Sequence, residues 1–235
     1  MKKITALFIF AVVLAAALAG CAGNKDMTAR YEGDTLIVEN ARPAKTANQA
    51  YNEMGGINYP QYFDLDDLET DFKRTADFHD AVIVKAEKGK STSYYTKGEK
   101  NGQTLTELTV KEVLWSSSEE YRELKSFSLD EPFFYKQDEN GNLEFCLGGI
   151  PVSIFLDDGA EYYILYLRKV RPDAPEREKA VYGENWYLFA GFRVDKSIFS
   201  DVVRGKEATG FVGLYPKLYR QVYYKYVIVC GENAQ

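Results

Sequence analysis

His79 is the one histidine of the chain, and imidazole is the side chain most often used as a general base near neutral pH. Its neighbours Asp77 and Asp80 are of the type that orients such a base. The sequence contains no Gly-x-Ser-x-Gly elbow and no Ser-x-x-Lys motif that would supply a nucleophile. A lone histidine between a predicted helix and a predicted strand is more typical of a structural role, so we assign no catalytic residue.

Acidic side chains gather between residues 64 and 71, where they could bind calcium or act as a carboxylate pair on a glycosidic bond. They are Asp64, Asp66, Asp67, Glu69 and Asp71. Leu65, Leu68 and Phe72 keep helical spacing through the same segment, and two bases follow at 73 and 74. Early acids and late bases suit the helix dipole. The cluster is therefore interpreted as the first turns of a solvated helix over 64–78.

The stretch 138–142, Asp-Glu-Asn-Gly-Asn, has the composition of a calcium loop, but Leu147 stands where the bidentate glutamate belongs. Its Asn140-Gly141 pair predicts a hairpin turn instead. No Cys or His residues have zinc-ligand spacing, and no glycine-rich segment fits a phosphate-binding motif. We expect neither a metal site nor a cofactor.

Three tyrosine pairs are the remaining candidates for a binding surface: Tyr94-Tyr95, Tyr162-Tyr163 and Tyr223-Tyr224. Adjacent side chains on a strand point to opposite faces, so one of each pair could be exposed. Exposed rings would stack on sugars or form a protein-binding face. Burial at the edges of the core is the other interpretation, and the more common one.

The first 21 residues have the organisation of an export signal: a basic start, an apolar run and small residues before a cysteine. The tetrad Leu18-Ala19-Gly20-Cys21 resembles the lipobox of bacterial lipoproteins. The resemblance implies cleavage after Gly20 and a lipid on Cys21, which would anchor an extracytoplasmic protein in the cell membrane. Residues 4–18 are short for a transmembrane helix, which needs about 20 apolar residues.

The charge of the mature chain excludes some partners. Lys2 and Lys3 are the only charged residues of the signal, so 27 bases and 35 acids remain, a formal net charge of −8. This balance argues against nucleic acid, which requires a basic patch.

Two cysteines remain after lipidation, Cys146 and Cys230, and outside the cytoplasm they could form a disulfide or stay as buried thiols.

The elements predict a single mainly β domain over 35–235, preceded by a tether over 21–34. Strands are predicted at 35–39, 80–85, 91–96, 103–115, 123–129, 143–147, 161–167 and 186–194. Asn101-Gly102 predicts the hairpin between the third and fourth of these. Residues 214–229 fit a helix or a strand equally well.

The order of the strands within residues 76–195 resembles uncharacterised extracytoplasmic domains of Gram-positive lipoproteins. Its elements are the run Asp80–Val84, a strand ending at Leu114, the run Gly159–Leu167 and the run Tyr187–Val194. These domains are OB-like and similar to the netrin and metalloproteinase-inhibitor barrel, which implies an α+β fold with a small closed β-barrel and one flanking helix. The inhibitors use a free N-terminal cysteine amine, which lipidation of Cys21 would consume, so inhibition is not implied.

Together these features predict a membrane-anchored, non-catalytic binding or interaction module with a protein or glycan partner at the cell envelope. Two alternatives stay open. One is a hydrolase of cell-wall or glycan substrates that uses carboxylates not identified in the sequence. The other is a structural component of an envelope complex. A fold-level resemblance does not decide among these functions.

Overall fold

Strands make up about half of the described chain. The computed structural model describes residues 27–46, 49–50, 53, 62, 64–148, 155–174, 185–195 and 216–228. The strands are β1 (Thr28–Glu32), β2 (Thr35–Glu39), β3 (His79–Thr96), β4 (Gln103–Ser116), β5 (Ser126–Glu131), β6 (Phe133–Gln137), β7 (Leu143–Leu147), β8 (Tyr162–Val170) and β9 (Trp186–Val194). The helices are α2 (Leu65–Arg74) and α5 (Pro216–Tyr223), which a π-helical turn at Tyr224–Ile228 continues. The expected mainly β, α+β class is confirmed.

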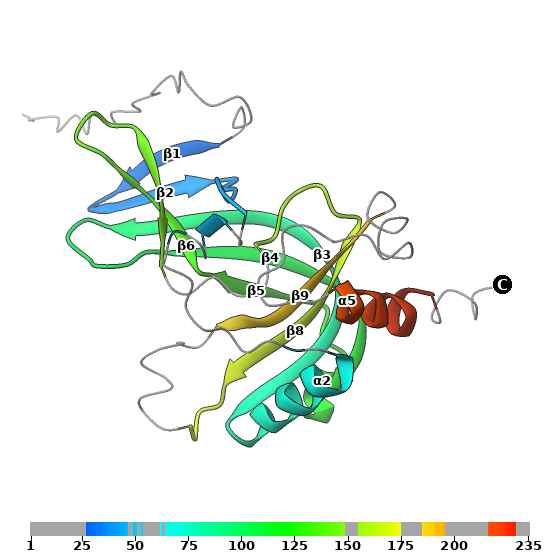
Figure 1. The fold of residues 1–235 in the computed structure, drawn as a ribbon. Coiled ribbons are helices and arrows are strands. Elements are labelled where there is room, and N and C mark those ends of the chain that lie inside the picture. The colour runs from blue at the N-terminus through cyan, green and yellow to red at the C-terminus, as the bar shows by residue number, and fades with distance from the viewer. Residues whose placement is uncertain are drawn as a thin grey trace, which may run out of the picture.

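Five strands form a closed ring of hydrogen-bonded pairs in the order β3, β4, β5, β9, β8 and back to β3 (Figure 1). All pairs are antiparallel except β5 with β9, which is parallel. The inward side chains of the ring form one apolar cluster that includes Val82, Val84, Leu129, Leu165 and Leu188. The ring is the main β element of the chain, while the resemblance to OB-like domains stays a prediction.

The strand β3 is longer than the sequence indicates, because the predicted strands 80–85 and 91–96 are one continuous element. Its first half pairs with β8 and its second half pairs with β2, while β4 runs beside both halves. The β1–β2 hairpin thereby extends the sheet beyond the ring. β1 occupies residues that the sequence assigned to the tether, so the fold begins earlier than residue 35: the Gly33 turn, with φ of 60°, folds Thr28–Glu32 back onto β2.

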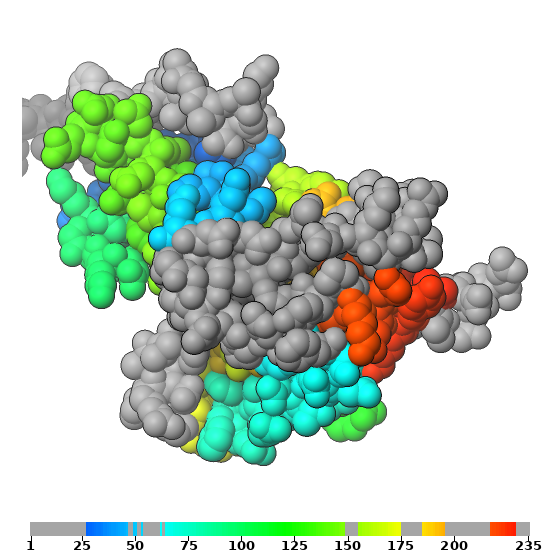
Figure 2. Space-filling view, in the orientation of Figure 1, coloured from blue at the N-terminus to red at the C-terminus, as the bar shows by residue number. Residues whose placement is uncertain are grey.

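The two helices cover the outer face of β3, β8 and β9. Leu68 and Phe72 of α2 pack there with Leu218 and Val222 of α5, and all four are buried. The two helices lie against each other in the space-filling view (Figure 2), joined by a 3.0 Å bond from the Leu65 amide to the Gln221 side chain. The helix expected over 64–78 is confirmed for Leu65–Arg74, and a short 3-10 turn at Thr75–Asp77 follows it. The ambiguous C-terminal segment is helical over the described residues 216–228.

A second layer covers the sheet extension. The β6–β7 hairpin packs Phe133 and Tyr135 against Leu36 and Val38 of β2, forming a cluster separate from the ring interior. Asp138 closes this hairpin by accepting bonds from the amides of Asn140 and Asn142, at 2.9 and 2.8 Å. Residues 138–142 are therefore the turn that Asn140-Gly141 predicts.

The β3–β4 hairpin forms as predicted, but Gly102 serves a purpose other than the turn. The chain reverses earlier, at Gly98 with φ of 93°, where the Glu99 amide bonds to the Thr96 carbonyl at 3.0 Å. A Cβ on Gly102 would lie 2.4 Å from the Tyr94 carbonyl oxygen and 2.7 Å from the Phe134 ring. Gly102 therefore allows β6 to pack closely on this hairpin.

Replacement of Gly102 by Ala is expected to lower the free energy of unfolding by about 2 kcal/mol, because backbone and ring must move apart to admit the methyl group. Urea denaturation followed by tryptophan fluorescence measures the change. Asn101→Ala, at the exposed neighbouring position, is the control and is expected to change stability by less than about 0.5 kcal/mol. Equal effects of the two substitutions would contradict the packing role.

No helix among the described residues is long and apolar enough to cross a membrane. The predicted signal peptide and Cys21 lie outside those residues, as does Cys230.

Candidate functional site

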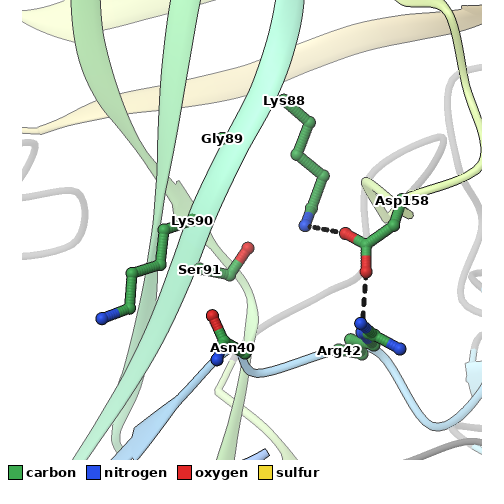
Figure 3. A pocket seen from close by; sticks show the side chains of 7 residues that line it. All are labelled: Asn40, Arg42, Lys88, Gly89, Lys90, Ser91 and Asp158. Carbon is green, nitrogen blue, oxygen red and sulfur yellow. Dashed lines mark hydrogen bonds and ion pairs between the residues drawn. The ribbon is translucent and has the colours of Figure 1, made fainter. Parts of the chain in front are cut away.

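A hollow of about 230 Å³ lies where the ring meets the sheet extension (Figure 3). It lies beside β3, the segment that follows β2, and the turn that precedes β8. Its lining consists of Asn40, Arg42, Lys88, Gly89, Lys90, Ser91 and Asp158. Three of these side chains are cationic and one is a carboxylate, so the hollow is locally positive although the chain as a whole is acidic.

A β-bulge in β3 builds one wall of the hollow. Lys88 is opposite Leu108 and Ser91 is opposite Thr106, so β3 carries one more residue than β4 between these pairs. Before the bulge the even-numbered residues of β3, such as Ala86, are buried, and after it the odd-numbered residues, such as Ser91, are buried. The bulge therefore changes the direction of the side chains between these two residues. The bulge brings Gly89 so close to β4 that a Cβ would lie 3.2 Å from that of Glu107.

The opposite wall is the segment after β2. Asn40 ends this strand with φ of 54°, a left-handed conformation that Asn tolerates better than most residues. The turn directs the chain across β3, and the Ala41 amide then bonds to the Ser91 carbonyl at 3.0 Å. Arg42 is thereby placed at the edge of the hollow, across from Lys88.

Lys88 and Arg42 converge on a single carboxylate. The Lys88 ammonium lies 2.5 Å from Asp158 Oδ1, and Arg42 Nε lies 2.7 Å from Asp158 Oδ2 (Figure 3). The Lys88 side chain is only 7% exposed, whereas that of Asp158 is 47% exposed. Lys90 extends away from Asp158 (Figure 3). It pairs with Glu39 at 2.8 Å. The buried cation of the hollow is therefore neutralised by an anion that solvent can reach.

A layer of buried polar side chains lies behind the hollow, at the end of the ring interior. The Ser91 and Thr106 hydroxyls are 2.8 Å apart, and Thr106 donates to the Glu131 carboxyl. The Leu156 amide donates to the other Glu131 oxygen at 2.9 Å. Burial raises the pKa of Glu131 to about 7, against the lowering effects of these two bonds and of the Lys88 charge.

Glu131 is a residue that sequence reasoning missed. It lies on β5 two positions after Leu129, and the two side chains share the inward face of the ring. The alternation of side chains along a strand was the available signal, because it places Glu131 on the same face as the apolar Leu129. Its neighbour Asp130 points to the other face, and partial burial raises the pKa of Asp130 to about 6.

His79 lies buried at the first position of β3, on the same strand as Lys88 but at its other end from the β1–β2 extension. The Tyr187 hydroxyl is 3.0 Å from His79 Nδ1, and the two rings meet edge to face. Asp80 accepts a bond from the Tyr121 hydroxyl at 2.9 Å instead of orienting the imidazole. The structure thus places His79 in packing contacts and brings none of the hollow residues beside it.

The acidic cluster at 64–71 is divided between two roles. Asp64 caps α2 by accepting from the Asp67 amide at 3.1 Å, and Asp66 and Asp67 occupy the first turn as the helix interpretation expects. Glu69 departs from that interpretation, because it is buried rather than solvated. It accepts bonds from Lys225 and Tyr226, each at 2.6 Å, and so connects α2 to the C-terminal helix.

Two of the six paired tyrosines are in the core, three are partly buried and one is exposed. Tyr163 and Tyr223 are fully buried, and Tyr95 stacks on Phe134 with centroids 5.4 Å apart. Tyr224 is the exposed member of its pair, at 48%. The large exposed apolar side chains among the described residues are those of Tyr31, Phe78 and Tyr224, which lie in three different segments of the chain. They do not form an aromatic face.

Cys146 lies on β7, half-buried, and burial raises the pKa of its thiol. The proposed disulfide to Cys230 stays a prediction, because Cys230 lies outside the described residues. Within those residues, no group of three or more His, Cys, Asp or Glu side chains is placed to hold a metal ion.

Comparisons of the chain with protein-family models, with curated proteins and with solved structures found no match. The site is therefore interpreted from its geometry alone.

Proposed function

We propose that the protein is a membrane-anchored, extracytoplasmic, non-catalytic binding module, and that the hollow beside β3 is its binding site. The observation that carries the proposal is the convergence of Lys88 and Arg42 on one accessible carboxylate. Side chains of this kind bind an anionic ligand without reacting with it, because they offer hydrogen-bond donors and positive charge. The lipobox-like tetrad ending at Cys21 supports the anchor.

The lining of the hollow favours binding over glycoside hydrolysis. A hydrolase requires two carboxyl groups that flank the scissile bond, about 5 to 10 Å apart. Among the described lining residues Asp158 is the one carboxylate, and it is held between two cations. Glu131 has the raised pKa of a general acid but is only 3% exposed and faces the ring interior.

The anchor is tested by replacing Cys21 with Ser in the full chain expressed in a bacterial host. The native chain is expected to incorporate a clickable palmitate analogue and to partition with the membrane fraction. Cys21→Ser, which lacks the thiol that accepts the lipid, is expected to incorporate none. Equal labelling of both proteins would contradict the anchor.

Binding is tested with the full-length lipoprotein in non-ionic detergent and isolated cell-wall material, measured by co-sedimentation. We expect the Lys88→Met and Arg42→Gln substitutions to weaken binding at least tenfold, since each removes a charged donor that lines the hollow. Lys111→Met is the matched control, because this exposed lysine pairs with Glu87 on the outer surface.

Reducing ends released into the supernatant are measured in the same samples. A constant low value with time is expected for a binding module. Release that increases with time and is lost in Asp158→Asn would contradict the proposal and support the hydrolase.

A further inference from the structure

We propose that the hollow is an oxyanion site in which Asp158 occupies the position of the ligand, and that a phosphate or carboxylate group of the ligand displaces Asp158 from Lys88 and Arg42. This deepens the proposed function and rests on it for the location of the site. It adds the chemical class of the ligand and the way in which the ligand enters.

The first step is the requirement of Lys88 for an anion. Its side chain is 93% buried, since 7% is exposed, and an ammonium removed from water must be paired to be tolerated. Asp158 provides this pairing from a turn that is distant in sequence, 70 residues away. The Lys88 ammonium therefore needs an anion beside it, and the anion present, the Asp158 carboxylate, comes from a turn outside the ring.

The second step is that Asp158 can leave without disturbing its turn. The backbone there is held by the preceding residue: the Asp157 carboxylate accepts from the Gly159 amide at 2.9 Å and pairs with Arg193. The Tyr163 hydroxyl also donates to the Asp157 carbonyl, at 2.9 Å. The Asp158 side chain takes no part in these contacts, so its rotation into solvent leaves the turn in place.

The third step is the chemistry of the incoming group. The carboxylate of Asp158 binds one ammonium and one guanidinium nitrogen, and a phosphate or a carboxylate presents oxygens of the same kind. Lys90 also lines the hollow but is paired with Glu39, so Lys88 and Arg42 are the cations that bind the incoming oxyanion. Release of Asp158 takes its carboxylate away from the buried Lys88 ammonium and from Arg42, and the oxyanion of the ligand takes its place. The volume of about 230 Å³ accommodates such a group together with part of the molecule that carries it.

The proposal is tested by isothermal titration of the full-length lipoprotein in non-ionic detergent at low ionic strength. The probes are glycerol 1-phosphate and glucuronate, which carry the two kinds of oxyanion on small polar molecules. Asp158→Asn is expected to bind a probe at least tenfold more tightly than the native protein, because the internal competitor has lost its charge. Lys88→Met and Arg42→Gln are expected to bind at least tenfold more weakly.

Thermal unfolding shows whether each variant is folded. If Lys88→Met is poorly folded, Arg42→Gln still tests the same site, because the Arg42 side chain is 36% exposed. Lys111→Met controls for the general loss of positive charge. Tighter binding of glycerol 1-phosphate identifies a phosphate ligand, and tighter binding of glucuronate identifies a carboxylate. Equal affinity also supports an oxyanion site.

Two results would overturn the inference: an Asp158→Asn variant that binds neither probe more tightly than the native protein, and a loss in Lys111→Met as large as that in Lys88→Met. Cell-wall binding that still depends on Lys88 and Arg42 in that case would leave the proposed function standing. Conversely, tight probe binding without any cell-wall binding would reject the proposed function while the oxyanion chemistry holds.

Discussion

Replacing Glu131 with Gln is expected to stabilise the protein at pH 8 by up to about 3 kcal/mol. The carboxyl group is buried, and its pKa is raised from 4.5 to about 7. At pH 8 the native protein must therefore hold an ionised carboxylate in the ring interior, which costs about 1.4 kcal/mol per pKa unit. Gln carries no charge and keeps one oxygen, which can accept from the Leu156 amide, while its NH2 group can donate to the Thr106 hydroxyl.

The same substitution is expected to remove most of the pH dependence of stability between pH 4.5 and 7. In this window Glu131 is ionised in the unfolded chain and protonated in the folded protein, so folding takes up a proton. The unfolded state binds fewer protons, and the native stability therefore falls as the pH rises. Below pH 4.5 both states are protonated at this position, and above pH 7 both are ionised, so the slope disappears.

Urea denaturation of the native protein and of Glu131→Gln at pH 5 and pH 8 measures both effects. Asp130→Asn is the control, because the pKa of Asp130 is raised only from 3.8 to about 6 and its window closes at lower pH. A native stability that rises from pH 5 to pH 8 by the same amount in both proteins would contradict this account.

Replacing Glu69 with Ala is expected to lower the free energy of unfolding by about 3 kcal/mol, because it removes the shared acceptor of a buried network. Lys225, Tyr226 and Tyr166 all donate to Glu69 Oε1. Lys73 lies 3.2 Å from the other oxygen. The loss would leave two buried hydroxyls without this acceptor and release the C-terminal helix from α2.

The pH dependence of Glu69 has the opposite sign to that of Glu131. Burial by itself would raise the pKa of Glu69, but the bonds from Lys225 and Tyr226 lower it below the usual 4.5. Its contribution to stability is therefore present above pH 4.5 and is lost as the pH falls through the lower pKa of the folded protein. Glu69→Ala is expected to reduce the acid sensitivity of the protein in that range.

Denaturation at pH 7 and pH 3.5 measures both consequences. Glu87→Ala is the matched control, since Glu87 forms an exposed ion pair with Lys111 and its loss is expected to change stability by less than about 1 kcal/mol. Glu69→Gln, which keeps one acceptor oxygen, is expected to fall between Glu69→Ala and the native protein. Equal stability of Glu69→Ala and Glu87→Ala would show that the network contributes little.

Local patterns were sufficient to predict most of the ring. The β-branched run after Asp80 and the apolar run after Glu161 predicted β3 and β8, and Asp64 with its following acids predicted the beginning of α2. These signals depend on residues within one element, where burial on one face leaves a periodic pattern. The continuity of β3 was missed because the polar residues of its bulge resemble a loop.

The candidate site was not predictable in the same way. Arg42, Lys88 and Asp158 come from three segments, and each alone has the composition of an ordinary solvated surface. Their association depends on a bulge, on the left-handed backbone of Asn40 and on which strands pair across the ring. Glu69 was assigned to solvent for a similar reason, since its partners Lys225 and Tyr226 lie more than 150 residues away in sequence.

The length of β3 has a consequence for how the molecule opens. The strand β3 belongs both to the ring, where it pairs with β8, and to the sheet extension, where it pairs with β2. β4 is hydrogen-bonded to β3 along both parts. Hydrogen exchange at the two ends of β3 should consequently report a single cooperative opening instead of two separate ones. The hollow lies at the midpoint of this strand, so a ligand that fills it would slow exchange in both parts of the sheet.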